Sequence, residues 1–139
     1  YQHVFHPAAP NLAFIGLCIV TGPLFPVAEL QARRVARVFA GEVSLPAPAG
    51  GHRQIHEQKR AATRRGAHPL RVQLLDYMDA LAKQIGVVPK LLRHPRLIVP
   101  LLAGPLVAAQ YRLDGPGQWE GAAVHIRKVS TPGRAPSGR

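Results

Sequence analysis

The sequence predicts a mainly α-helical protein with one short β element. Apolar residues recur at helical spacing over residues 26–40 and residues 70–85, which predicts two helices. The short apolar run of residues 12–15 predicts a buried strand ahead of the first helix. Proline and glycine divide much of the remaining sequence into short segments.

The first helix has a predicted start, face and end. Pro26 suits the first helical turn, where its missing N–H would be unpaired anyway. Gly41 fits the C-terminal cap. With the strand and the uncharged segment 17–26, this helix completes a strand-loop-helix unit, the kind of unit at which doubly wound folds bind ligands. The predicted buried face of the helix consists of Ala28, Ala32, Val35, Ala36 and Phe39.

The middle of the chain changes from a linker to a second helix. Prolines and glycines give residues 45–51 the composition of a linker or surface crossing. A basic stretch, residues 53–65, follows and is compatible with a helix. Gly86 ends the helix predicted over residues 70–85. Its predicted buried face consists of Leu70, Leu74, Tyr77, Leu81 and Ile85.

The last part of the sequence predicts only short helices. Polar residues, glycine and proline predict disorder from Arg127 onward. Trp119 belongs to the last of the predicted helices. These short helical segments cover residues 89–93, 95–103, 106–111 and 118–126.

The chain is strongly basic. Its 18 Lys and Arg outnumber its 7 Asp and Glu, for a formal net charge of +11. This balance makes nucleic acid and anionic membranes partner classes to consider. However, the bases of residues 53–65 and of the tail have no aromatic residues among them to stack on nucleotide bases, so we favour a solvated basic face and no nucleic-acid partner. The apolar runs 12–28 and 97–109 contain proline and glycine and are shorter than the roughly 20 residues of a membrane-spanning helix.

The residues alone indicate no catalytic site and no metal site. Cys18 is the single cysteine, which excludes an internal disulfide or a thiolate zinc cluster and favours a cytoplasmic location. His52 and His56 have helical spacing, but no third ligand accompanies them. No serine is placed for a nucleophilic triad, and no glycine-rich phosphate loop is present.

Several sequence segments, in order, resemble flavin-containing monooxygenases of the dimethylaniline N-oxide-forming type. The first is Tyr-Gln-His-Val-Phe at residues 1–5, and the third is Pro-Val-Ala-Glu-Leu-Gln-Ala-Arg at residues 26–33. The order and the gaps between the segments agree with that family over residues 1–126. The complete set comprises residues 1–5, 12–17, 26–33, 76–79 with 85–89, and 111–121.

This resemblance implies a two-domain α/β flavoprotein with two dinucleotide-binding domains, of which the chain is a C-terminal fragment. Residues 1–45 then belong to the FAD domain, residues 46–126 form a helical extension, and residues 127–139 form a disordered basic tail. In such enzymes NADPH reduces FAD, and a flavin C4a-hydroperoxide oxygenates the nitrogen or sulfur of small amines or sulfides. The family's glycine-rich motifs lie upstream, so we expect this chain to need the missing N-terminal half of the enzyme and to be inactive alone.

The resemblance also implies which residues lie beside the cofactor. They belong to the uncharged segment before the first helix and contact it mainly through the backbone. Two residues depart from the family pattern: Ile19 stands where many relatives have Gln, and Arg34 where they usually have Trp. We expect the Arg34 stem to cover apolar surface while its head reaches water. The cofactor-contact candidates are Gly16, Leu17, Gly22, Pro23 and Leu24.

Two other functions stay open. A Baeyer-Villiger monooxygenase acting on ketones is a close relative that the upstream sequence would distinguish. A small basic adaptor could instead use residues 53–65 to bind nucleic acid or acidic lipid, and its DNA binding would weaken steeply with salt.

Overall fold

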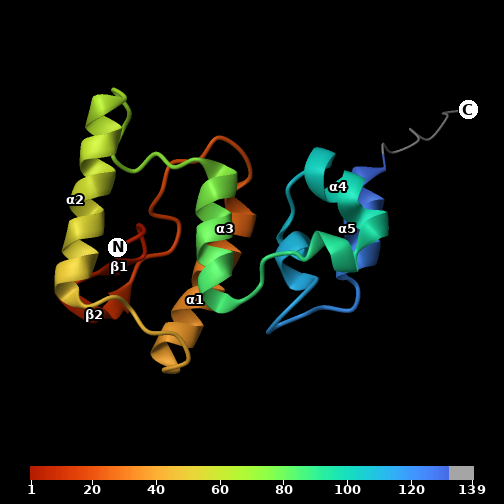
Figure 1. Cartoon of the computed structure of the whole chain (residues 1–139), viewed down its shortest axis with the longest axis horizontal. Coiled ribbons are helices and arrows are strands. Elements are labelled where there is room, and N and C mark those ends of the chain that lie inside the picture. The colour runs from red at the N-terminus through yellow and green to blue at the C-terminus, as the bar shows by residue number, and fades with distance from the viewer. Residues whose placement is uncertain (132–139) are drawn as a thin grey trace, which may run out of the picture. The chain divides into compact units, whose positions relative to one another are not determined.

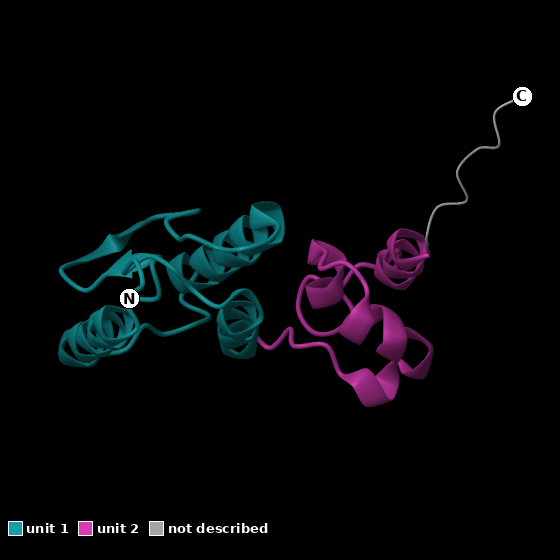
Figure 2. Cartoon of the chain, turned by 90° about the horizontal axis from the view of Figure 1, so that it is seen from above, with its two compact units in different colours: residues 1–85 teal, residues 86–139 magenta. Residues whose placement is uncertain are grey.

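The computed structural model describes residues 1–131, which form two compact units divided between Ile85 and Gly86 (Figure 2). The prediction of a mainly helical chain with a short β element is confirmed. No described helix is both long and apolar enough to cross a membrane. Unit 1 contains β1 (Phe5–His6), β2 (Ala9–Ala13), α1 (Leu24–Phe39), α2 (Pro48–Arg64) and α3 (Leu74–Ile85) (Figure 1). Unit 2 contains α4 (Ile98–Ala103), α5 (Ala122–Ser130) and the 3₁₀ helices η1 (Leu91–Arg93), η2 (Pro95–Leu97) and η3 (Ala108–Arg112).

The boundary between the units differs from the predicted domain boundary. Compact unit 1 continues through α2 and α3, past the boundary expected at residues 45 and 46. The reason is that α3 packs on α1, so that residues on both sides of the expected boundary share one core. The assignment of residues 1–45 to an FAD domain stays a prediction.

The two strands form an antiparallel hairpin in which Phe5 lies opposite Ala13. The prediction of a buried strand over residues 12–15 is wrong, because β2 ends at Ala13. Leu12, Phe14 and Ile15 are 49%, 43% and 53% exposed. An apolar run is compatible with a strand, but burial requires a second layer, and these three side chains lack a full covering within unit 1.

Helix α1 begins two residues before the predicted start and ends one residue before the predicted end, and Gly41 is the C-terminal stop as predicted. Gly41 has φ +75°, the left-handed conformation that terminates many helices. Its N–H donates to Val38 O at 3.0 Å, and Glu42 N–H donates to Arg37 O at 2.9 Å. This pair of hydrogen bonds is a Schellman motif.

The predicted buried face of α1 is wrong. Ala36 and Phe39 are exposed, and the remaining members of the predicted set are only partly buried. The face that packs against α3 includes a glutamine and an arginine, which a search for apolar residues does not select. The buried residues of α1 are Pro26, Val27, Leu30, Gln31 and Arg34.

Helix α2 begins inside the predicted linker. Pro48 occupies the start of the helix, where a proline loses no hydrogen bond. Gly51 is buried against Pro7, and a Cβ at residue 51 would lie 3.1 Å from Pro7 Cγ. Most of the following residues are exposed, in agreement with a solvated basic helix.

Helix α3 supplies the other side of the unit 1 core. Tyr77, Leu81 and Ile85 are buried as predicted, whereas Leu70 precedes the helix and Leu74 is only partly buried. The α1–α3 interface and the N-terminal segment build this core. Its fully buried apolar residues are Val4, Val27, Leu30, Met78, Leu81 and Ala82.

Unit 2 has the short helices that proline and glycine predict. Trp119 precedes α5 and is 46% exposed, so the last helix starts later than expected. Because α5 continues through Ser130, the prediction of disorder is wrong for residues 127–130, and residues 132–139 lie outside the described residues. Ile126 anchors this helix in the core of unit 2. This core consists of Leu97, Ala109, Leu113, Ala122 and Ile126.

Candidate functional site

The loop of residues 14–23 connects β2 to α1 and contains most of the predicted cofactor-contact residues. Gly16 and Gly22 have φ angles of +81° and +134°, which L side chains rarely adopt. A Cβ at Gly22 would also lie 2.7 Å from Leu74 Cδ2. Leu24 is the first residue of α1. Gly16, Leu17, Gly22 and Pro23 thus lie in this loop, and Leu24 lies at the start of the helix that follows it.

A buried hydrogen-bond network holds the first part of this loop. Gly16 N–H donates to Gln31 Oε1 at 2.7 Å. Gln31 Nε2 donates to Tyr77 Oη, also at 2.7 Å, and the Tyr77 hydroxyl donates to Gln2 O. Because Gln31 is fully buried, it fixes the Gly16 backbone relative to α1 and α3.

Tyr77 is a protonated donor in this network. Burial raises the pKa of its phenol to about 12, assisted by Cys18 and opposed by the Gln31 hydrogen bond and the Arg34 charge. Sequence reasoning assigned Gln31 and Tyr77 no functional role. The available signal was a glutamine one turn after Val27, on the face that helical spacing from Val27 and Leu30 directs inward.

The middle of the loop is held by its backbone. Ile19 N–H donates to Leu70 O at 2.8 Å, and Val72 N–H donates to Ile19 O at 3.0 Å. This isolated parallel bridge uses both polar backbone groups of Ile19. Ile19, which stands where many relatives have Gln, is 37% exposed. The backbone hydrogen bonds that anchor the loop therefore do not depend on its side chain.

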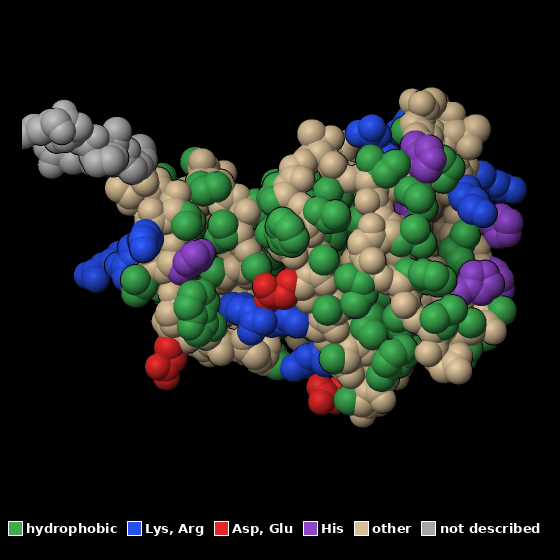
Figure 3. Space-filling model, turned by 180° about the vertical axis from the view of Figure 1, so that it is seen from behind, with side chains coloured by type: hydrophobic (Ala, Val, Ile, Leu, Met, Phe, Trp, Pro, Cys, Tyr) green, Lys and Arg blue, Asp and Glu red, His purple; other side chains and the backbone are tan. Residues whose placement is uncertain are grey.

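The apolar side chains of this loop and of the first turn of α1 are exposed rather than covered within unit 1. Leu17 and Leu24 are 43% and 44% exposed, and Phe25 is 89% exposed. Hydrophobic side chains are numerous on the molecular surface seen in Figure 3. Exposed apolar side chains that gather in one segment are typical of surfaces that bind ligands or other protein parts. The loop is thus fixed by hydrogen bonds while its apolar groups remain available.

The start of α1 offers unpaired backbone donors. Pro23 is the N-cap residue, and no side chain of residues 1–131 caps the helix. The first turn also contains no acidic residue. Free N–H groups and the positive end of the helix dipole favour an electron-rich or anionic group at this point.

Arg34 is fully buried, which corrects the expectation that its head reaches water. The guanidinium carbon lies 5.0 Å from the centre of the Tyr1 ring and 5.2 Å from that of Phe5. Burial lowers the pKa of Arg34, while Tyr1 and Tyr77 oppose this effect. Its Nε and Nη1 have no hydrogen-bond partner in the described part of the chain. The planar guanidinium packs over the rings of Tyr1 and Phe5, where the family resemblance expects the planar ring of Trp.

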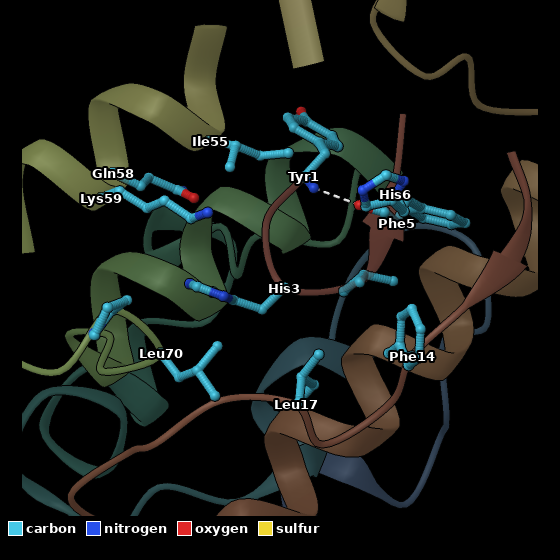
Figure 4. Close-up of a pocket in the computed structure, with 12 residues that line it drawn as sticks. Tyr1, His3, Phe5, His6, Phe14, Leu17, Ile55, Gln58, Lys59 and Leu70 are labelled. Atoms are coloured by element: carbon cyan, nitrogen blue, oxygen red, sulfur yellow. Dashed lines mark hydrogen bonds between the residues drawn. The ribbon is translucent and has the colours of Figure 1, made fainter. Parts of the chain in front are cut away.

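A cavity of about 220 Å³ lies beside the loop. Leu17 and Phe14 form one part of its wall, and Ile55 and Lys59 of α2 form another (Figure 4). Leu17 is the only predicted cofactor contact among the described residues that line it. The complete lining comprises Tyr1, His3, Val4, Phe5, His6, Phe14, Leu17, Ile55, Gln58, Lys59, Pro69 and Leu70.

The histidines do not form a metal centre with their neighbours. His52 lies near His6, with 6.3 Å between the ring centres. Within residues 1–131, no group of three or more His, Cys, Asp or Glu side chains could hold a metal ion.

Comparison with known proteins relates the whole described chain to one family. The family model described as flavin-binding monooxygenase-like matches residues 1–131. Flavin-containing monooxygenase 2 of Homo sapiens is 42% identical over 132 residues, which cover 88% of this chain and 25% of that protein. Flavin-containing monooxygenase 5 of Mus musculus is 36% identical over 136 residues, which cover 91% of this chain and 26% of that protein. The chain thus spans about a quarter of the length of these relatives.

Proposed function

The chain belongs to the flavin-binding monooxygenase-like family, and from this membership we propose that it forms one wall of the flavin site of an FAD- and NADPH-dependent monooxygenase. The complete enzyme transfers oxygen to the nitrogen or sulfur of small amines or sulfides. The name dimethylaniline monooxygenase, N-oxide-forming, given to several relatives, supports nitrogen oxygenation. The part of the enzyme that corresponds to the unmatched length of the relatives supplies the nucleotide-binding domains.

The observation that carries this proposal is a loop that is fixed yet uncovered. Gln31 and the Ile19 bridge hold the backbone of residues 14–23, whereas the loop side chains Ile15 and Leu17 remain exposed. A free surface loop with these side chains would gain stability by burying them. We therefore propose that the bound flavin and the remaining part of the same enzyme cover this surface.

The chemistry of the loop fits a flavin. Leu17 and Leu24 offer apolar contacts for a planar ring system, and Gly16 leaves its backbone accessible, because an added Cβ would meet no described atom within 4 Å. The uncapped first turn of α1 would favour the negative charge of a reduced flavin. FAD supplies the redox and oxygen chemistry when bound, and these residues contribute position, exclusion of water and electrostatics.

A chimaera tests the proposal. The chain would replace the matched C-terminal quarter of human flavin-containing monooxygenase 2, and bound FAD, NADPH oxidation and N,N-dimethylaniline oxygenation would be measured. We expect the chimaera to retain FAD and oxygenate the amine, and the 139-residue chain alone to do neither. Tight FAD binding with NADPH consumption by the chain alone would contradict the proposal, as would a folded chimaera without FAD.

A matched pair of variants makes the chimaera experiment specific to the loop. Gly22→Val introduces a side chain at φ +134° and toward Leu74, so we expect it to reduce FAD retention. Gly66→Val, at φ +61° with nothing within 4 Å of the added Cβ, controls for backbone strain away from the loop.

Product analysis with a ketone in place of the amine distinguishes a Baeyer-Villiger enzyme, which would form an ester.

A further inference from the structure

The chemistry of the cavity beside α2 points to a ligand other than the flavin. We propose that this cavity binds a small, apolar molecule that carries an anionic group, with the anionic group beside Lys59. The cavity contains only Leu17 of the predicted flavin contacts, so this inference does not rest on the proposed monooxygenase function. It identifies an additional binding site formed entirely by unit 1.

The size and the lining of the cavity favour a ligand with a small apolar part. Its volume of about 220 Å³ lies below the roughly 300–1,000 Å³ of pockets for drug-sized ligands. Phe5 and Phe14 contribute aromatic surface, and Leu17, Ile55 and Leu70 contribute aliphatic surface. Burial of a short alkyl or aryl group against these side chains provides the driving force for binding.

The polar part of the lining is basic. Figure 4 shows the amino group of Lys59 and the amide of Gln58 extending from α2 toward the space between Tyr1 and His3. None of the described lining residues carries a carboxylate. Lys59 also makes no ion pair with a described residue, so its ammonium group is available to a ligand.

His3 contributes a hydrogen-bonding group to the same end of the cavity. Burial lowers the pKa of its imidazole below the ordinary value, which favours the neutral ring at neutral pH. A carboxylate can therefore pair with Lys59 and approach a neutral imidazole. A protonated amine would meet the Lys59 charge without a compensating acid, which disfavours it.

Three ligands that differ only in their head group test the preference. The 139-residue chain would be titrated at neutral pH with hexanoate, hexan-1-ol and hexylamine in separate experiments. Binding would be monitored through the NMR chemical shifts of Val4, Leu17 and Ile55. We expect hexanoate to bind about fivefold more tightly than the alcohol, the upper range for a solvent-accessible ion pair, and hexylamine to bind most weakly. Equal affinities, preference for hexylamine, or shifts located outside the cavity would overturn the proposal.

Matched variants assign the preference to the cavity. Lys59→Met keeps much of the side-chain stem and should abolish the preference for hexanoate, whereas Lys83→Met on the exposed part of α3 should leave it unchanged. Ile55→Trp should weaken binding of hexanoate and hexan-1-ol together by filling the cavity. A hexanoate preference that persists in Lys59→Met would disprove the assigned anion position. None of these measurements requires FAD. A negative result would therefore overturn the cavity proposal without affecting the monooxygenase proposal, which the chimaera tests separately.

Discussion

At the scale of single residues, one glutamine decides the position of the candidate flavin loop. Gln31 accepts from Gly16 N–H and donates to Tyr77, with both bonds at 2.7 Å. It also points its amide nitrogen at Cys18 Sγ across 3.9 Å. A buried amide that is satisfied on both sides gives the loop one defined position, because leaving either group unpaired is costly.

Replacement of Gln31 by leucine tests this anchoring. Gln31→Leu keeps the approximate size of the side chain but leaves Gly16 N–H without its acceptor, so we expect a loss of about 1–3 kcal/mol in the free energy of unfolding of unit 1. Hydrogen exchange should show faster exchange of the Gly16 amide. The control Gln54→Leu, at an exposed position of α2, should change neither quantity. Unchanged protection at Gly16 in Gln31→Leu would show that another group holds the loop.

The pH dependence of stability tests the state of Tyr77. Its phenol has a pKa of about 12 in the folded chain and an ordinary value of 10.0. A raised folded-state pKa contributes stability that is complete below the unfolded value and is lost as pH rises through the folded value. We expect a decline between about pH 10 and pH 12 that is absent from Tyr77→Phe, with each free energy of unfolding measured by urea titration. Ultraviolet titration that finds every phenol near pH 10 would contradict this expectation.

At the scale of elements, glycines place the ends of helices and the turns between them. Gly41 ends α1 with φ +75°, and Gly115 adopts φ +76° in the turn that follows η3. Their surroundings differ, since a Cβ at Gly41 would meet nothing within 4 Å, whereas one at Gly115 would lie 2.2 Å from Gly86 O. Gly115 is therefore required by both backbone conformation and close approach.

Alanine substitutions separate these two effects. Gly41→Ala adds only the energetic cost of placing a side chain in the left-handed conformation, so we expect it to destabilise unit 1 by about 1–2 kcal/mol. Gly115→Ala adds a clash with a backbone oxygen, so it should destabilise unit 2 by more than that amount. Hydrogen-exchange protection of α1 and α5 measures the two effects separately. Equal costs for the two variants would show that the backbone at Gly86 moves away freely.

At the scale of the whole chain, the exposed apolar surface is the feature with most consequence. The cores of both units are complete around residues such as Leu30 and Ile126, yet Phe14, Ile15 and Phe25 remain at the surface. A folded unit gains little from such exposed groups. They fit the proposal that a further part of the enzyme and its cofactor cover the loop.

A comparison of two apolar residues of α1 tests this separation between core and interface. Phe25→Ser should change the free energy of unfolding by no more than about 0.5 kcal/mol, because Phe25 is 89% exposed. It should also reduce the fluorescence of the apolar probe ANS. Leu30→Ser, at a residue that is 1% exposed, should instead destabilise unit 1 by about 2–5 kcal/mol. Destabilisation of similar size in both variants would place Phe25 in the core.

Sequence patterns predicted the elements of the fold better than their faces. Helical spacing identified α3 and its buried Tyr77, and Gly41 identified the end of α1. The same reasoning chose the wrong face of α1, because it assigned burial to apolar residues and left out Gln31 and Arg34. Gln31 is satisfied in the interior by its hydrogen bonds, and the Arg34 guanidinium lies over the rings of Tyr1 and Phe5.

The candidate site divides in the same manner. The family resemblance selected Gly16, Gly22 and their neighbours, and whether these residues touch a cofactor stays a prediction. It could not identify the cavity, since Phe14 and Lys59 are separated by many residues in the chain and meet only in the folded unit. The spacing of residues along the sequence does not predict such contacts, because the elements between them differ in length and direction.

The sequence by itself determined the helical character of the chain, the positions at which glycine and proline end its elements, and the family to which it belongs. The tertiary structure alone decided which side of α1 faces inward, that the loop before it stays exposed, and that Lys59 faces an apolar cavity. The physical reason is that helix formation and turns depend on neighbouring residues, whereas burial depends on which distant surfaces cover one another.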